Sequence, residues 1–467
     1  GSSGTGASGG VANTGGAGDS AGTAGGDLGG TGGYIDPGGP PTLIKVSENR
    51  RFFQTEDGRP FYWQGDTAWL LFVQLTREEV EVYLENRRER GFNVIQVMVL
   101  DNIGTENKYG DKPFSSMSSP TTTPGNDPSN DEEYDWWDHA DYVIDLAAEK
   151  GIYMALVVMW GKPWAGSASV DEVTAFAAFL ADRYKDRPNI FYLNGGDRPG
   201  SFAMDKFVAI GTTLDATDPN HLITFHPRGH MHSSTWFHDA SWLDFNMFHT
   251  GHKERLTWEY VKEDYDLTPI KPTLDGEPAY EEITVELDGK VYWTDADNRR
   301  HAWRSVLSGS AGHTYGHNAV WQFNQPGYSA KFHCRQEWQE GIEFPGAAQM
   351  QHIKNLMLSR MPYFDRIPDQ SLIAKQAPDG KGEVNLDYLV ASRGERYAFV
   401  HTVKGATMEI NMGKIAGAQV KASWYDPRTG QFEEIGTTDN TAGTVQTFDP
   451  PGEPEEGNDW VLVLDSI

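Results

Sequence analysis

The sequence predicts an α/β protein, a (β/α)8 barrel of the TIM type followed by a small all-β sandwich domain. Short apolar runs alternate with amphipathic helical segments from about residue 43 onward, which is the pattern of a parallel sheet covered by helices. Eight such runs are present, and eight βα units close into a barrel. After Pro362 the helical pattern stops and only short strands at hairpin spacing follow, which is typical of a sandwich. An open, doubly wound sheet is the alternative for the first part.

The eight barrel strands are expected to be almost continuously apolar, because both faces of a parallel barrel sheet are buried. Their expected positions, in chain order, are Phe61–Gln64, Phe92–Leu100, Ile152–Met159, Asn189–Leu193, Leu222–Phe225, Leu243–Phe248, Pro272–Leu274 and His313–Trp321.

Helices are expected between these strands. The first begins after Thr76, since Glu78 and Glu79 follow in its first turn, and it ends near Gly91,. The remaining helices are expected at residues 136–150, 171–184, 201–216, 257–265, 296–308 and 346–359.

The chain is expected to have three parts: a flexible linker at residues 1–42, the barrel at 43–364 and the sandwich at 365–467. Residues 1–40 contain 17 of the 51 glycines and almost no large apolar side chain, so this segment cannot bury enough surface to offset its ordering entropy. It resembles the spacer of a bacterial surface lipoprotein. We therefore expect a secreted or cell-surface protein with a lipid anchor upstream of the linker; an artificial start is the alternative.

Composition excludes several classes of function. The formal net charge is −28 and the pI is near 4.8, so binding to nucleic acid is not expected, because phosphates require a surplus of Lys and Arg. Cys334 is the one cysteine, which rules out an intrachain disulfide framework. No apolar run approaches the ~18 residues of a membrane span, so no integral membrane segment is expected.

Two strand ends carry the residues that we expect to be catalytic. In a barrel of this kind the catalytic groups lie at the carboxyl ends of the strands. The fourth expected strand ends in the sequence Asn-Gly-Gly-Asp, which presents Asp197, and the seventh ends in Asp-Gly-Glu, which presents Glu277. Cleavage of a glycosidic bond requires two carboxyl groups that flank it, so Asp197 and Glu277 are predicted to be a catalytic pair. The alternative is structural: Asp197 caps the next helix and Glu277 pairs with Arg299 or Arg304.

Polar and aromatic residues at the other strand ends indicate a cleft for sugar rings. The residues expected to contact a carbohydrate substrate are Asp66, Trp69, Trp160, Asn194, His226, His249, His317 and Trp321. His226, His230, His232 and His238 are a possible zinc cluster, but their spacing matches no standard site. We expect no metal and no cofactor.

Several motifs resemble a known family, the apiosidase-like (DUF4038) catalytic domain. They are Phe61–Trp69, Gly91–Ile95, Trp303–Gly309 and Gly312–Asn318, and Trp424–Gly430 resembles the small collagen-binding-type domain that follows it. The resemblance covers most of the chain. It implies a glycoside hydrolase related to family 140 that acts on plant or microbial polysaccharide side chains, including furanosides such as apiose. By this resemblance Asp197 matches the acid/base and Glu277 the nucleophile. We expect a retaining mechanism; inversion, with the two carboxyl groups further apart, is the alternative.

Two other functions are alternatives to a glycoside hydrolase. The first is a non-catalytic carbohydrate-binding surface protein on a barrel scaffold, and the presence of both acids at the expected strand ends argues against it. The second is a protease or adhesin, suggested only by the name of the small domain. The sequence contains no His-Glu-x-x-His zinc motif to support proteolysis,.

Overall fold

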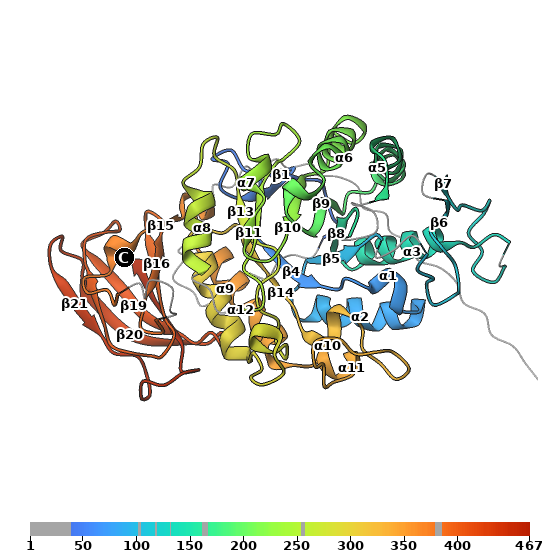
Figure 1. The fold of residues 1–467 in the computed structure, drawn as a ribbon. Coiled ribbons are helices and arrows are strands. Elements are labelled where there is room, and N and C mark those ends of the chain that lie inside the picture. Colours follow the sequence, from blue (N-terminus) through green and yellow to red (C-terminus); the bar gives the residue numbers. More distant parts are fainter. Residues whose placement is uncertain are drawn as a thin grey trace, which may run out of the picture. The chain divides into compact units, whose positions relative to one another are not determined.

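The computed structural model describes residues 39–100, 104–116, 119–130, 132–160, 167–253, 257–378 and 385–467. The linker expected at residues 1–42 lies almost entirely outside these residues. Figure 1 shows the succession of strands and helices, followed by the all-β domain.

Eight parallel strands form the barrel and confirm the predicted fold class. They are β4 (Trp63–Thr67), β5 (Val94–Met98), β8 (Tyr153–Val157), β9 (Ile190–Arg198), β10 (Ile223–Pro227), β12 (Asn246–His249), β13 (Thr273–Asp275) and β14 (Gly312–Tyr315). They are adjacent in chain order, and β14 pairs with β4. The ring closes between β10 and β12, where the Asp244 N–H donates to the Ile223 carbonyl at 2.9 Å. The short strand β11 (Met231–His232) adds antiparallel to β12.

The long helices lie where the sequence predicts them, within a few residues. They are α2 (Arg77–Glu89), α3 (Trp136–Glu149), α5 (Val170–Tyr184), α6 (Met204–Thr217), α8 (Thr257–Tyr265), α9 (Asp295–Leu307) and α12 (Pro345–Leu358). Helix α2 begins with a capping box between Thr76 and Glu79, which satisfies two backbone N–H groups that the helix itself leaves free.

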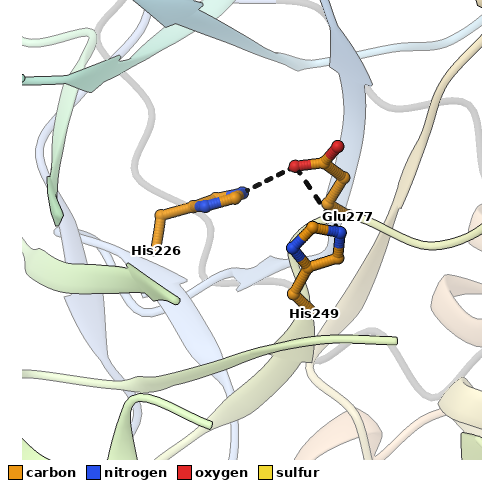
Figure 2. A group of neighbouring side chains, drawn as sticks. All are labelled: His226, His249 and Glu277. Carbon is orange, nitrogen blue, oxygen red and sulfur yellow. Dashed lines mark ion pairs between the residues drawn. The ribbon is translucent and has the colours of Figure 1, made fainter. Parts of the chain in front are cut away.

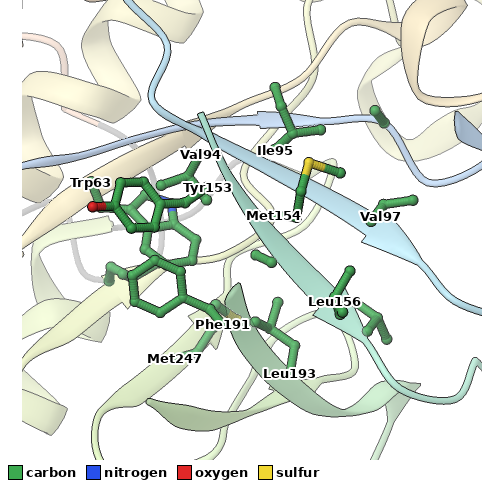
Figure 3. Close-up of a cluster of buried hydrophobic side chains, with 14 of the residues drawn as sticks. Trp63, Val94, Ile95, Val97, Tyr153, Met154, Leu156, Phe191, Leu193 and Met247 are labelled. Carbon is green, nitrogen blue, oxygen red and sulfur yellow. The ribbon is translucent and has the colours of Figure 1, made fainter. Parts of the chain in front are cut away.

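A small antiparallel sheet that the sequence did not predict packs on the amino-terminal side of the barrel. It consists of β1 (Ile44–Val46), β2 (Phe53–Thr55) and β3 (Pro60–Phe61). The Phe53 ring lies 5.0 Å from Phe245, 6.4 Å from Phe191 and 6.3 Å from Trp63, measured between centroids. These partners stand at or near the starts of barrel strands, and Figure 3 shows Trp63 and Phe191 within the apolar barrel interior. Aromatic packing therefore fills this end of the barrel.

The eighth predicted strand is wrong beyond Tyr315. Strand β14 ends there, and the short helix α10 (Asn318–Trp321) follows. His317 caps this helix, because its Nδ1 accepts a hydrogen bond from the Ala319 N–H at 3.1 Å. The apolar run in the sequence reflects burial of the helix, and periodicity in so short a run does not distinguish a strand from a helix. The other short helices are α1 (Leu71–Gln74), α7 (Ser234–Phe237) and α11 (Trp338–Gly341).

The C-terminal domain is all-β, as predicted. Its strands are β15 (Ile367–Pro368), β16 (Val390–Arg393), β17 (Tyr397–Thr402), β18 (Met408–Asn411), β19 (Gln419–Tyr425), β20 (Phe432–Asp439), β21 (Val445–Phe448) and β22 (Trp460–Ser466). Six of them form one antiparallel sheet, and β18 pairs with β21 in a second. Val400, Leu462 and Ile410 belong to the apolar core that the two sheets share.

The barrel and the β domain are joined by a buried contact. Arg299 on α9 donates from Nη2 to Asp459 Oδ1 at 2.8 Å and from Nε to Asp459 Oδ2 at 3.0 Å. Both side chains are almost fully buried. Beside them, the Trp303 and His401 rings stack at 5.8 Å. Among the described residues, no helix is long and apolar enough to cross a membrane.

Candidate active site

Asp197 lies in a bulge at the end of β9. His226 of β10 pairs with Gly195, but the next residues to pair are Pro227 and Arg198. Gly196 and Asp197 therefore have no partner on β10, and such an insertion re-aims the side chain that it carries.

The two glycines make this bulge sterically possible. Gly195 and Gly196 have φ angles of 86° and 126°, and Asp197 itself has a φ of 48°. A Cβ on Gly195 would stand 2.6 Å from the Phe225 ring, and one on Gly196 would stand 2.6 Å from the Met159 carbonyl oxygen. Only glycine satisfies both the backbone conformation and the close approach.

Glu277 follows β13, and a short hydrogen-bonded segment holds it in place. The buried Asp275 carboxylate accepts from Thr250 Oγ1 at 2.5 Å, from the Thr250 N–H at 3.3 Å and from the Glu277 N–H at 3.2 Å. The Gly276 carbonyl accepts from Gln96 Nε2 at 2.6 Å. Contacts from two other strand regions thus fix the backbone that leads into Glu277.

Three histidines surround the Glu277 carboxylate. His226 Nε2 lies 3.3 Å and His249 Nε2 lies 3.7 Å from Oε2, while His252 Nε2 lies 3.4 Å from Oε1. Figure 2 shows the His226 and His249 rings converging on the carboxylate. Glu277 is 6% exposed. The donor atoms of His226, His249 and Glu277 lie within 4.8 Å of one another, so these three residues could hold a metal ion.

The two predicted catalytic acids have pKa values shifted in opposite directions. Burial, followed by the negative charge of Glu277, raises the pKa of Asp197. Burial also acts to raise the pKa of Glu277, but the imidazoles of His249, His226 and His252 outweigh it and hold that pKa well below its usual range. The shifts favour ionisation of Glu277 and make Asp197 a weaker acid than an ordinary aspartate, which is the order of pKa values that acid–base catalysis by two carboxyls requires.

Aromatic side chains line the same region. The Trp69 ring lies 5.0 Å from Trp160 and 5.3 Å from His226, and Trp160 lies 5.7 Å from His226. Trp69 Nε1 donates to the Tyr280 hydroxyl at 3.0 Å, and the His252 ring lies 4.5 Å from Tyr280. The structure thus brings Trp69, Trp160, His226 and His249 into one group with Glu277.

His252 and Tyr280 belong to this group but were not predicted. Both lie three residues beyond a predicted site residue, His249 and Glu277 respectively. The prediction covered only the first residues after each strand, so it did not include His252 or Tyr280. A wider window on the loops after the sixth and seventh strands would have included both.

The structure places Asp66 and Asn194 against helices. Asp66 is fully buried, accepts a hydrogen bond from the Tyr83 hydroxyl at 2.7 Å and pairs with Arg87 at 3.5 Å, both on α2. Asn194 donates from Nδ2 to the Phe207 carbonyl on α6 at 2.7 Å. These contacts explain both side chains as links between the sheet and its helices, and the structure does not bring either to Glu277.

His317 and Trp321 also have local roles. His317 is the cap of α10, and its ring packs 4.6 Å from Phe344. Trp321 donates from Nε1 to Asn318 Oδ1 at 3.2 Å, and its ring faces Phe332 at 6.0 Å. These side-chain contacts belong to the segment after β14, whereas the Trp321 carbonyl accepts from the Leu70 N–H at 3.2 Å and His317 forms a parallel bridge with Glu281.

The contacts in the structure differ from the structural roles considered for the two acids. Helix α6 begins after Ala203, without a side-chain cap, so Asp197 does not cap it. Arg299 binds Asp459, and Arg304 donates to the carbonyls of Asn385 and Tyr388.

Of the other histidines considered for zinc, two have different partners. His232 Nδ1 lies 3.2 Å from Asp264 Oδ1, and His238 Nδ1 lies 3.3 Å from Asn246 Oδ1. The histidine cluster considered from the sequence is therefore not the group that the structure assembles. That group contains His249 and Glu277, which lie on different strand ends from His232 and His238.

A parallel barrel with carboxyl groups at the ends of its fourth and seventh strands is compatible with glycosidic cleavage by two carboxyls. Comparison with known families agrees: residues 47–365 match the model described as "Apiosidase-like, catalytic domain". The chain belongs to the apiosidase-like family of glycoside hydrolases. Residues 367–465 match the model described as "Putative collagen-binding domain of a collagenase".

Two solved structures are similar over nearly the whole chain. A structure described as a glycoside hydrolase is 40% identical, with a TM-score of 0.85, and the match covers 91% of this chain and 97% of the other. A structure described as a glycoside hydrolase family 5 protein from Bacteroides vulgatus ATCC 8482 is 38% identical, also with a TM-score of 0.85, over 91% of this chain and 93% of that one. No curated protein matched the chain. The enzyme class is therefore that of a glycoside hydrolase.

Proposed function

We propose that this enzyme hydrolyses glycosides with retention of anomeric configuration, with Glu277 as nucleophile and Asp197 as acid/base. The observation that supports this assignment is the opposite shift of the two pKa values, with Glu277 buried and Asp197 partly exposed. A nucleophile must be ionised before it attacks, and a general acid must still carry its proton.

The mechanism follows from these two states. A Glu277 oxygen attacks the anomeric carbon while Asp197 donates its proton to the departing glycosidic oxygen, which leaves as an alcohol. This step forms a glycosyl ester on Glu277. Asp197, now ionised, removes a proton from water, and the resulting attack on the anomeric carbon releases the sugar and restores both residues.

The histidines around Glu277 orient its carboxylate in this scheme. His252 approaches one oxygen and His226 approaches the other, so imidazole rings flank both oxygens and restrict rotation of the side chain. A carboxylate that is held in its attacking geometry loses less entropy in the transition state.

The proposed substrate is a furanoside, such as apiose, in a polysaccharide side chain. The family resemblance supports this choice. Trp160 is partly exposed and lies beside Trp69 and His226, and aromatic faces stack well on the apolar faces of sugar rings. A panel of aryl furanosides and pyranosides of pentoses and hexoses tests it: the highest kcat/KM is expected for a furanoside, and a preference for a pyranoside would contradict the proposal.

The catalytic assignment is tested with Asp197→Asn and Glu277→Gln. Each should lower kcat by about 10²–10⁴-fold, while the control Asp205→Asn, an exposed acid on α6, should retain full activity. Proton NMR of the first product anomer then distinguishes retention from inversion. Unchanged rates in both variants would refute the assignment, and the inverted anomer would refute the mechanism.

A further inference from the structure

We propose that His226, His249 and Glu277 also form a binding site for one zinc-type divalent ion, and that the bound ion inhibits the hydrolase. The inhibitory part of the proposal rests on the proposed function, because the ion would occupy the carboxylate oxygen that attacks the sugar. The binding part depends only on the geometry of the three side chains.

The distances fit a single ion. Zinc binds imidazole nitrogen at about 2.0–2.1 Å and carboxylate oxygen at about 2.0–2.2 Å, so tetrahedral donors stand roughly 3.4 Å apart. Glu277 Oε2 lies 3.3 Å from His226 Nε2 and 3.7 Å from His249 Nε2. One ion between these atoms would reach all three without a change of backbone.

The direction of the lone pairs gives a second argument. His249 Nδ1 lies 3.4 Å from the Pro227 carbonyl oxygen, which can only accept, so Nδ1 carries the ring proton and Nε2 presents a lone pair. That lone pair faces the lone pairs of Glu277 Oε2. In this tautomer the nitrogen and the carboxylate oxygen can both bind one cation. A ring N–H donated to a backbone carbonyl is also how proteins orient histidines that bind metals.

Burial gives a third argument. The exposed fractions of His226, His249 and Glu277 are 0%, 4% and 6%. In the part of the chain that the structure describes, His226 Nε2, His249 Nε2 and Glu277 Oε2 have no hydrogen-bond partner. Buried polar atoms are costly when they are unsatisfied, and here three of them converge on one point. Two imidazoles and a carboxylate suit zinc, copper, nickel or iron(II) better than calcium or magnesium.

Isothermal titration of the chelator-treated full chain with zinc chloride tests the site. One ion per chain is expected, with at least about a hundredfold weaker binding in His249→Ala and His249→Gln, whereas the exposed His333→Ala should bind like wild type. Zinc should also raise the Tm of the wild-type protein, a readout that needs no variant. Absence of binding at 100-fold molar excess, or equal binding by the His249 variants, would overturn the site.

Activity measurements on the same preparations test the inhibition. Stoichiometric zinc is expected to lower the hydrolysis rate at least tenfold, and EDTA should restore it. If the chelated enzyme were inactive and zinc restored its activity, the inhibitory role would be refuted. A chain that binds zinc but shows no glycosidase activity when chelated would contradict both the proposed function and the inhibition, while the zinc site would stand.

Discussion

The Asp275 carboxylate accepts a hydrogen bond from the backbone N–H of Glu277, two residues further along, at 3.2 Å. The same carboxylate accepts from Thr250, which follows β12. Asp275 therefore joins the ends of two neighbouring strands and fixes the start of the segment that carries Glu277. This contact makes it a positioning residue for the active site, although its own side chain is fully buried.

Replacing Asp275 by alanine should damage both stability and catalysis. The change leaves the Thr250 and Glu277 N–H groups without their acceptor. Each buried donor that lacks a hydrogen-bond partner lowers the free energy of unfolding by about 1–3 kcal/mol. We expect a loss of about 2–4 kcal/mol in the free energy of unfolding and a lower kcat with little change in KM. Asp275→Asn retains one acceptor oxygen and should lose less of both. Chemical denaturation and steady-state kinetics measure the two effects, and a fully active, fully stable Asp275→Ala would contradict the positioning role.

Gly196→Ala should abolish most activity. Its φ of 126° is unfavourable for alanine, and the new Cβ would lie 2.6 Å from the Met159 carbonyl oxygen, so the bulge that carries Asp197 must shift,. Gly436→Ala is the matched control, because Gly436 has a φ of 130° but open space around it. Both variants should lose stability from backbone strain, but only Gly196→Ala should lower kcat strongly. Equal kinetics in the two variants would show that the bulge does not position Asp197.

The dependence of kcat/KM on pH should report the two carboxyl groups separately. Glu277 acts when ionised, and its pKa lies well below the usual range, so the acid limb of the profile should lie at low pH. Asp197 acts when protonated, and its raised pKa places the alkaline limb above the value of an ordinary aspartate. Activity should therefore fall as pH rises through the Asp197 pKa. In Asp197→Asn, assayed on an aryl glycoside whose leaving group needs no proton, the alkaline limb should disappear; its persistence would assign that limb to another group.

The free energy of unfolding should decrease as the pH rises from about 4 to about 7, because of Glu281. Burial raises the pKa of this carboxyl to about 7, whereas in the unfolded chain it titrates near its ordinary value of 4.5. Between these values the folded state binds the extra proton, so raising the pH favours unfolding, by at most about 3 kcal/mol. Glu281→Gln, whose side chain can still accept from Tyr315, should show a flatter dependence of Tm on pH over this interval. An identical slope in the two proteins would exclude Glu281 as its source.

The barrel and the β domain should unfold together. Arg299 and Asp459 are 2% and 3% exposed, and breaking a buried pair from one side costs about 3–5 kcal/mol. Asp459→Ala should therefore lower the Tm of the whole protein. Glu434→Ala, which removes one partner of an exposed pair with Lys421 in the same domain, should change the free energy of unfolding by less than about 1 kcal/mol. Two separate calorimetric transitions in the wild-type protein would contradict the coupling.

The fold was predictable because its signals are local. Capping residues such as Thr76 and turn residues such as Gly91 act within a few positions of the chain. Catalytic residues of barrel enzymes lie at the carboxyl ends of strands. Only a few short segments of the sequence meet this condition, and two of them contain Asp197 and Glu277. The same condition cannot choose between the two faces of a strand, where successive side chains alternate. Asp66 was assigned to the barrel mouth for this reason, although it points to Arg87 on α2.

The sequence by itself determined the barrel, the β domain after it and the two carboxyl groups at the ends of the fourth and seventh strands, since apolar periodicity and glycine-flanked acids can be read over short spans. Only the tertiary structure decided the surroundings of those acids. His226 lies on β10, whereas His249 and His252 lie at and just after the end of β12. They reach one carboxylate because the barrel brings the ends of the fifth, sixth and seventh strands together. Burial and charge then act through space, so the protonation states of Asp197 and Glu277 depend on neighbours that are distant in the chain.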